Sequence, residues 1–93
     1  MDEEKTAYIK SGITRKIFTR PRPNDRYHRL SKMEQKFIRQ NAGLTALELE
    51  IFSRRCEGLS FDEISHKTGY HISYCKKIAG RIEKMIAALI SDI

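Results

Sequence analysis

The sequence predicts an all-α fold, a small bundle of helices that ends in one long helix. Three segments begin with the pattern Ser/Thr-x-x-Glu, in which the first and fourth residues bond each other's free backbone N–H groups at a helix start. These capping boxes open at Ser31, Thr45 and Ser60. Each is followed, one helix length later, by a glycine that suits the positive φ of a helix end. The three glycines are Gly43, Gly58 and Gly69.

The first 29 residues are predicted to form a basic arm, partly ordered at most, beside a helical domain of residues 30–93. Residues 1–10 are compatible with a short helix or with loose chain. From Ser11 to Arg29 we expect extended chain, because the prolines of Arg20-Pro-Arg-Pro lack a backbone N–H and restrict the preceding residue. Arg20 and Arg22 are candidates to contact DNA phosphates or a minor groove. A charged linker that keeps the protein in solution explains them equally well.

The first two helices of the domain follow from their caps and their apolar spacing. One is expected from Ser31 to about Asn41, with an apolar edge of Met33, Phe37 and Ile38. The next begins at Thr45 and closes at Gly58, with apolar residues at helical spacing: Leu47, Ile51 and Phe52.

The last helix is expected from about Ile72 to Ile90 and carries two apolar stripes. One stripe can dock on the preceding helices and contains Ile78, Ile82, Met85 and Leu89. The second has no obvious partner in the chain and contains Ala79, Ile86, Ile90 and Ile93. Burying one such side chain is worth about 1.5–3 kcal/mol. We therefore expect residues 1–10 or a second subunit to cover this stripe, and we favour a homodimer through the C-terminal helix.

A short helix opens at Ser60 and ends at Gly69, and a new helix begins only a few residues later, near His71. Two helices joined by such a glycine-containing turn describe a helix–turn–helix. If Ile72 is the first residue of the second helix, then Cys75, Ile78 and Ile82 face inward.

The run from Leu44-Thr45 through Glu48, Gly58-Leu59-Ser60 and Glu63-Ile64-Ser65 to Lys76 resembles two related families. One is region 4 of bacterial sigma factors, and the other is the LuxR/FixJ-type domain of response regulators. The resemblance covers about residues 44–85 and implies a DNA-reading helix over about residues 72–84. The chain resembles the small stand-alone, sigma-like regulators of phages and mobile elements.

Three positions depart from the family pattern. Ser65 stands where alanine is common, which still allows close helix packing. His71 replaces the usual Ser or Thr at the start of the reading helix and is a poorer cap. Cys75 replaces a β-branched residue and behaves as a small apolar group.

The outward face of this helix supplies the candidate DNA contacts. The first turns of a recognition helix reach base edges in the major groove. There Lys77 could donate to guanine, and Ser73 to a base or phosphate. Tyr74 could touch a thymine methyl group or a phosphate, and Lys76 lies beside them. Further along, Arg81 and Lys84 would hold the DNA backbone. A solvated helix face is the alternative interpretation of these residues.

Charge agrees with an anionic partner but is unevenly distributed. The 93 residues carry a formal net charge of +6, with 18 Lys and Arg against 12 Asp and Glu. Eleven of the basic and five of the acidic residues lie in residues 1–43, so residues 44–93 hold seven of each and are neutral. A small basic helical domain favours nucleic acid as its partner.

Other functions find less support in the sequence. Cys56, His66, His71 and Cys75 would suit zinc by ligand type, but their spacings match no zinc module, and no cofactor or metal is expected. No nucleophile, paired carboxylate or phosphate loop indicates an enzyme. Neither a signal peptide nor an apolar run of membrane-spanning length is present, so we expect a cytoplasmic protein with free thiols.

The predicted function is sequence-specific binding of double-stranded DNA, as a small transcription regulator or sigma region 4-like factor. One alternative is a protein-interaction module that docks on RNA polymerase or another regulator. A phage small-terminase protein for DNA packaging would use a similar domain.

Overall fold

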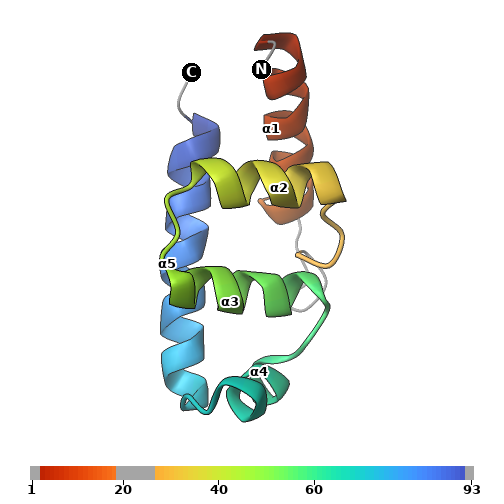
Figure 1. The fold of residues 1–93 in the computed structure, drawn as a ribbon. Coiled ribbons are helices and arrows are strands. Elements are labelled where there is room, and N and C mark those ends of the chain that lie inside the picture. Colours follow the sequence, from red (N-terminus) through yellow and green to blue (C-terminus); the bar gives the residue numbers. More distant parts are fainter. Residues whose placement is uncertain (1–2, 19–26, 92–93) are drawn as a thin grey trace.

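The computed structural model describes residues 3–18 and 27–91, which contain five α-helices and no strand (Figure 1). The all-α prediction is confirmed. The helices are α1 (Glu3–Ile17), α2 (Lys32–Asn41), α3 (Ala46–Cys56), α4 (Phe61–Thr68) and α5 (Ile72–Ser91). Within the described ranges, none of them combines the length and the apolar character needed to cross a membrane.

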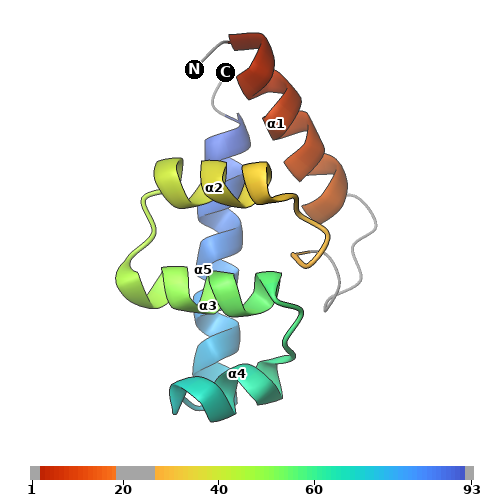
Figure 2. The ribbon, with the colours of Figure 1, turned by 45° about the vertical axis from the view of Figure 1, so that its right-hand side comes forward.

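The long helix α5 is the axis of the molecule, and the other four helices all contact it. In Figures 1 and 2, α2, α3 and α4 cross α5 one below another, while α1 lies beside its upper half. The start of α5 therefore lies next to α4 at one end of the molecule. The end of α5 lies near the start of α1 at the other end.

All three predicted capping boxes are present, which explains why α2, α3 and α4 begin where they do. At α4, Ser60 Oγ accepts the Glu63 N–H at 3.2 Å and Glu63 Oε1 accepts the Ser60 N–H at 2.9 Å. The same reciprocal bonds join Ser31 to Glu34 and Thr45 to Glu48. The three predicted terminators all have positive φ: Gly43 at 71°, Gly58 at 89° and Gly69 at 80°.

The N-terminal segment differs from the prediction. Ser11–Ile17, predicted as extended chain, forms the second half of α1. The physical reason is a stripe of isoleucines at four-residue spacing, Ile9, Ile13 and Ile17, all buried in the common core. The prolines come after the helix has ended, so they do not oppose it. The boundary at residue 29 therefore does not separate an arm from the core, because α1 belongs to that core.

The rest of the predicted arm lies partly outside the described residues. Arg20 and Arg22 belong to residues 19–26, which are not among them. Tyr27–Arg29 form a turn in which Tyr27 is buried, with its ring edge-on to that of Phe52 at 5.9 Å between centroids. The end of the predicted arm is therefore anchored in the core.

Helix α1 also explains what covers the second apolar stripe of α5. Of this stripe, Ala79 and Ile86 are buried and Ile90 packs against the core. Helix α1 contacts α5 and lies beside its later half (Figures 1 and 2). Cover by the N-terminal segment, the first of the two predicted alternatives, is thus what the structure shows for the described part of the stripe. The stripe gives no further reason to expect a homodimer. Ile93 lies outside the described residues.

Candidate nucleic-acid interface

The connection between α4 and α5 is a three-residue turn, Gly69–His71, that both helices hold in place. The Gly69 N–H donates to Ser65 O at 2.9 Å, closing α4. Two side chains then donate to the Tyr70 carbonyl, Ser65 Oγ at 2.5 Å and Cys75 Sγ at 3.8 Å. A donor from each helix thus meets one carbonyl, and these bonds tie the turn to both α4 and α5.

His71 caps the start of α5. Its Nδ1 accepts the Ser73 N–H at 3.1 Å, and its carbonyl accepts the N–H groups of Tyr74 and Cys75 at 3.0 and 3.1 Å. An imidazole nitrogen thereby replaces the hydroxyl of a usual N-cap. The prediction that Ile72 is the first helical residue is confirmed.

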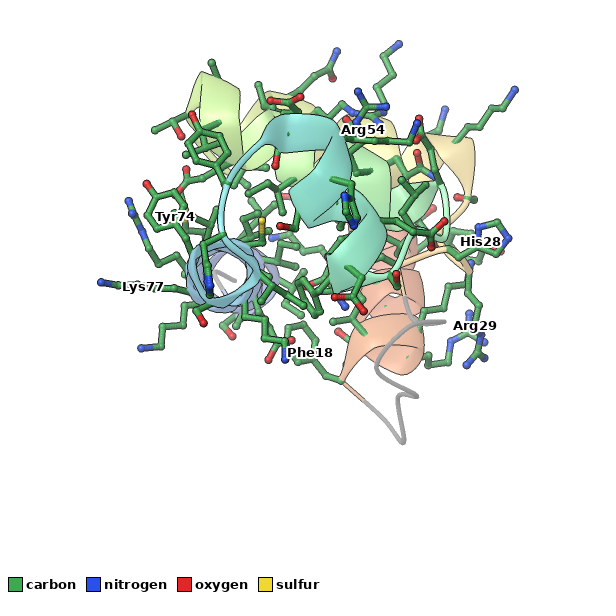
Figure 3. All side chains as sticks on the ribbon, turned by 90° about the horizontal axis from the view of Figure 1, so that it is seen from below. Phe18, His28, Arg29, Arg54, Tyr74 and Lys77 are labelled. Atoms are coloured by element: carbon green, nitrogen blue, oxygen red, sulfur yellow. The ribbon has the colours of Figure 1, made fainter. Side chains whose placement is uncertain are left out.

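The inward and outward faces of α5 are those that the sequence predicted. Cys75, Ile78 and Ile82 are buried in the core. The candidate contact residues are all exposed, and they are Ser73, Tyr74, Lys76, Lys77, Arg81 and Lys84. Seen from the α4 end of the molecule in Figure 3, Tyr74 and Lys77 extend from α5 away from the body of the protein.

These exposed residues differ in how firmly the protein holds them. Within residues 3–18 and 27–91, Lys77 and Lys84 have neither an ion-pair nor a hydrogen-bond partner. Lys76 leans back towards α4, with its Nζ 6.0 Å from the centre of the Phe61 ring. The two free ammonium groups are therefore the ones available to an external anion.

Arg81 is partly committed to the protein. Its Nη2 lies 3.4 Å from Glu48 Oε2, while the carboxylate of Glu48 is buried and 1% exposed. The contact has the distance of an ion pair but not the geometry of a hydrogen bond, so Oε2 has no hydrogen-bond donor among the described residues. Arg81 compensates a buried charge at the start of α3, and only its exposed side can face a ligand.

Sequence reasoning missed Tyr70, which lies in the turn just before α5. Its side chain is 43% exposed, and its ring stands 5.4 Å from that of Tyr74, with 44° between the two planes. The two tyrosines form an exposed aromatic pair beside the first turn of α5. Their four-residue spacing in the sequence was the available signal, but it crosses a helix boundary and so does not indicate one helix face.

The acidic residues of α4 and the basic residues of α5 lie in different places. Helix α5 contains four basic residues and one carboxylate, Glu83. The acidic residues of α4, Asp62 and Glu63, lie in its first turn. The eight residues of α4 span about 12 Å. The last turn of α4, and not the first, lies beside the start of α5 (Figures 1 and 2). The neutral sum of residues 44–93 thus conceals a cationic face on α5 that is separate from these carboxylates.

The two cysteines are buried and free. Burial raises the pKa of the Cys56 thiol to about 12, against the smaller opposing effect of Arg39 and Arg55, so this thiol is protonated at neutral pH. Cys75 lies in the core under the turn. Among the described residues, no three His, Cys, Asp or Glu side chains are grouped so that they could hold a metal ion.

No protein-family model, curated protein or solved structure matched this chain. The resemblance to sigma region 4 and LuxR-type domains therefore stays a prediction from the sequence.

Proposed function

We propose that α4 and α5 act as a helix–turn–helix that binds double-stranded DNA, with the first turns of α5 in the major groove. The observation that carries this proposal is the outward face at the start of α5, where free Lys77 stands beside exposed Ser73 and Tyr74. A helix with side chains is about 10–12 Å wide, and the major groove of B-DNA is about 12 Å wide.

In this arrangement each exposed residue has a chemical role. Lys77 donates to the O6 or N7 of guanine, and Ser73 to a base edge or a phosphate. The Tyr70–Tyr74 pair offers apolar edges to thymine methyl groups and two hydroxyls to phosphates. Lys84 contacts the DNA backbone, where Arg20 and Arg22 add affinity that depends on salt and not on sequence. By its resemblance, the protein is a small transcription regulator of the sigma region 4 kind.

The test is selection of binding sites from random duplex DNA, at two salt concentrations, with three proteins. The wild type should enrich a sequence motif. Lys77→Ala should relax the motif at one or two positions, because each good base contact discriminates by about 1–3 kcal/mol. The double variant Arg20→Ala/Arg22→Ala should weaken binding alike on all sequences and make it less sensitive to salt.

Two results would reject the proposal. One is the absence of duplex binding by the wild type at low salt. The other is that the arginine variant changes the motif and Lys77→Ala does not.

The protein-docking alternative loses one of its reasons, since α1 covers the apolar stripe of α5 that a partner would have used. The dependence of binding affinity on salt concentration still distinguishes the two functions. DNA binding should fall steeply with added salt, whereas apolar docking on RNA polymerase or another protein should change little.

A further inference from the structure

Four of the five glycines in the chain have a reason inside the protein. Gly43, Gly58 and Gly69 adopt positive φ at the ends of helices. Gly12 allows α1 to approach α2, because a Cβ there would collide with the Glu34 carboxylate. These four positions show that glycine occurs in this chain where the backbone or its neighbours demand it.

Gly80 is the exception. It lies inside α5, where glycine is among the least favourable residues, and its backbone is helical. A Cβ built at this position would meet no atom within 4 Å. Nothing in the described part of the protein therefore requires the absence of a side chain at Gly80.

The surroundings of Gly80 are cationic and exposed. Lys77 and Lys84 stand one turn before it and one turn after it, and Ser73, Lys77, Gly80 and Lys84 follow one another at helical spacings of four, three and four. Both lysines are free of partners among the described residues. The outward face of α5 thus contains a patch of bare backbone with a free ammonium group on either side.

The position along the helix indicates what would approach this patch. Gly80 lies about 12 Å from Ile72 along the helix axis at 1.5 Å per residue. The major groove is about 8.5 Å deep, so a helix that enters it by its first turns reaches the rim of the groove near this point. The rim consists of sugar and phosphate, which is anionic and matches the two lysines.

We propose that Gly80 is the point where a DNA strand passes closest to α5, with the sugar–phosphate backbone seated on the bare helix between Lys77 and Lys84. This inference rests on the proposed function. A side chain at position 80 would hold the strand away from the helix, lengthen the distance between Lys84 and phosphate, and draw Lys77 back from the base edge. A second copy of this chain fits the patch less well, because a two-fold axis there would bring the same lysines face to face.

The experiment combines stability and affinity in the variants Gly80→Ala and Gly80→Leu. Both replacements favour helix, so both variants should unfold at a higher temperature than the wild type. Both should nevertheless bind random-sequence duplex DNA more weakly, by roughly tenfold for alanine and more for leucine. The slope of affinity against salt should fall by about 1 when the new side chain breaks the contact between Lys84 and phosphate. Ala88→Leu, an exposed change two turns further along α5, is the matched control and should bind as the wild type does.

The outcomes separate this inference from the function on which it rests. If the wild type fails to bind duplex DNA, the proposed function is wrong and the inference falls with it. If the wild type binds and both Gly80 variants bind equally well, only the inference is wrong. It is also overturned if the variants are less stable than the wild type, or if they change from dimer to monomer by size-exclusion chromatography at unchanged DNA affinity.

Discussion

At the scale of single residues, the candidate interface depends on side chains that stabilise the fold and face solvent at the same time. His71 and Arg81 are the two clearest cases. His71 ends the turn and opens α5 through its ring nitrogen, and Arg81 compensates a carboxylate under α5. Both lie next to the proposed DNA contacts, so their effects on stability and on binding have to be measured separately.

For His71, replacement by alanine should lower the free energy of unfolding by about 1 kcal/mol, because the Ser73 N–H loses its acceptor. His71→Ser should restore most of this loss, since a serine hydroxyl is a stronger N-cap. Urea unfolding at pH 7.5 followed by circular dichroism gives both values. An alanine variant as stable as the wild type would show that the ring nitrogen does not cap α5.

For Arg81, replacement by alanine should lower the free energy of unfolding by roughly 1–2 kcal/mol, because it leaves the buried Glu48 carboxylate uncompensated. The expected loss is modest since Arg81 is itself 58% exposed. Adding Glu48→Gln should recover stability, because glutamine keeps the capping bond to Thr45 and carries no charge. A loss of DNA affinity without a loss of stability would instead make Arg81 a phosphate contact.

At the scale of helices, α1 and α2 are joined by one buried carboxylate. Glu34 Oε1 accepts from Lys16 Nζ of α1 and from the Ser31 N–H, both at 2.8 Å. Burial raises the pKa of Glu34, but these hydrogen bonds and the charge of Lys16 outweigh it and bring the pKa below its ordinary value of 4.5. The junction of the N-terminal helix with the domain is therefore sensitive to acid.

A lowered pKa in the folded state means that this contact stabilises the protein in full above about pH 4.5 and loses its effect as the pH falls through the folded pKa. Glu34→Gln should thus be less stable than the wild type at pH 7, by about 1 kcal/mol, and the difference should shrink towards pH 3. Urea unfolding at pH 7, 5 and 3 measures it. Glu63→Gln is the control, because Glu63 is the corresponding capping residue of α4 and lies away from α1. If the stability of both variants depends on pH in the same way, the contact with Lys16 does not explain the effect of Glu34→Gln.

At the scale of the whole molecule, the sequence predicted the elements whose ends are set by neighbouring residues. The boundaries of α2, α3 and α4 follow from capping boxes and glycines, which are bonds over three or four residues. The second half of α1 was missed for the opposite reason, and its first half was left open as helix or loose chain. Its isoleucine stripe becomes informative only once α2 and α5 are known to cover it, and these contacts are far apart in the chain.

At the candidate interface too, contacts between different parts of the fold could not be predicted from the sequence. Exposure of Ser73 and Lys77 follows from helical spacing alone and was predicted. The pairing of Arg81 with Glu48 and the contact of Tyr70 with Tyr74 depend on how α3 and the turn pack against α5. Spacing within one helix does not contain that information.

Because α5 runs the full length of the molecule, its two ends have separate surroundings. The first residues of α1 and the last of α5 lie at one end, and the turn before α5 lies at the other (Figure 1). Twenty residues of helix measure about 30 Å. A fluorescent dye, an affinity handle or a fused domain attached near Glu3 or Ser91 would be carried on a stiff rod, roughly a molecular length away from a bound duplex. Such attachments can report on, or immobilise, the protein while the opposite end remains accessible.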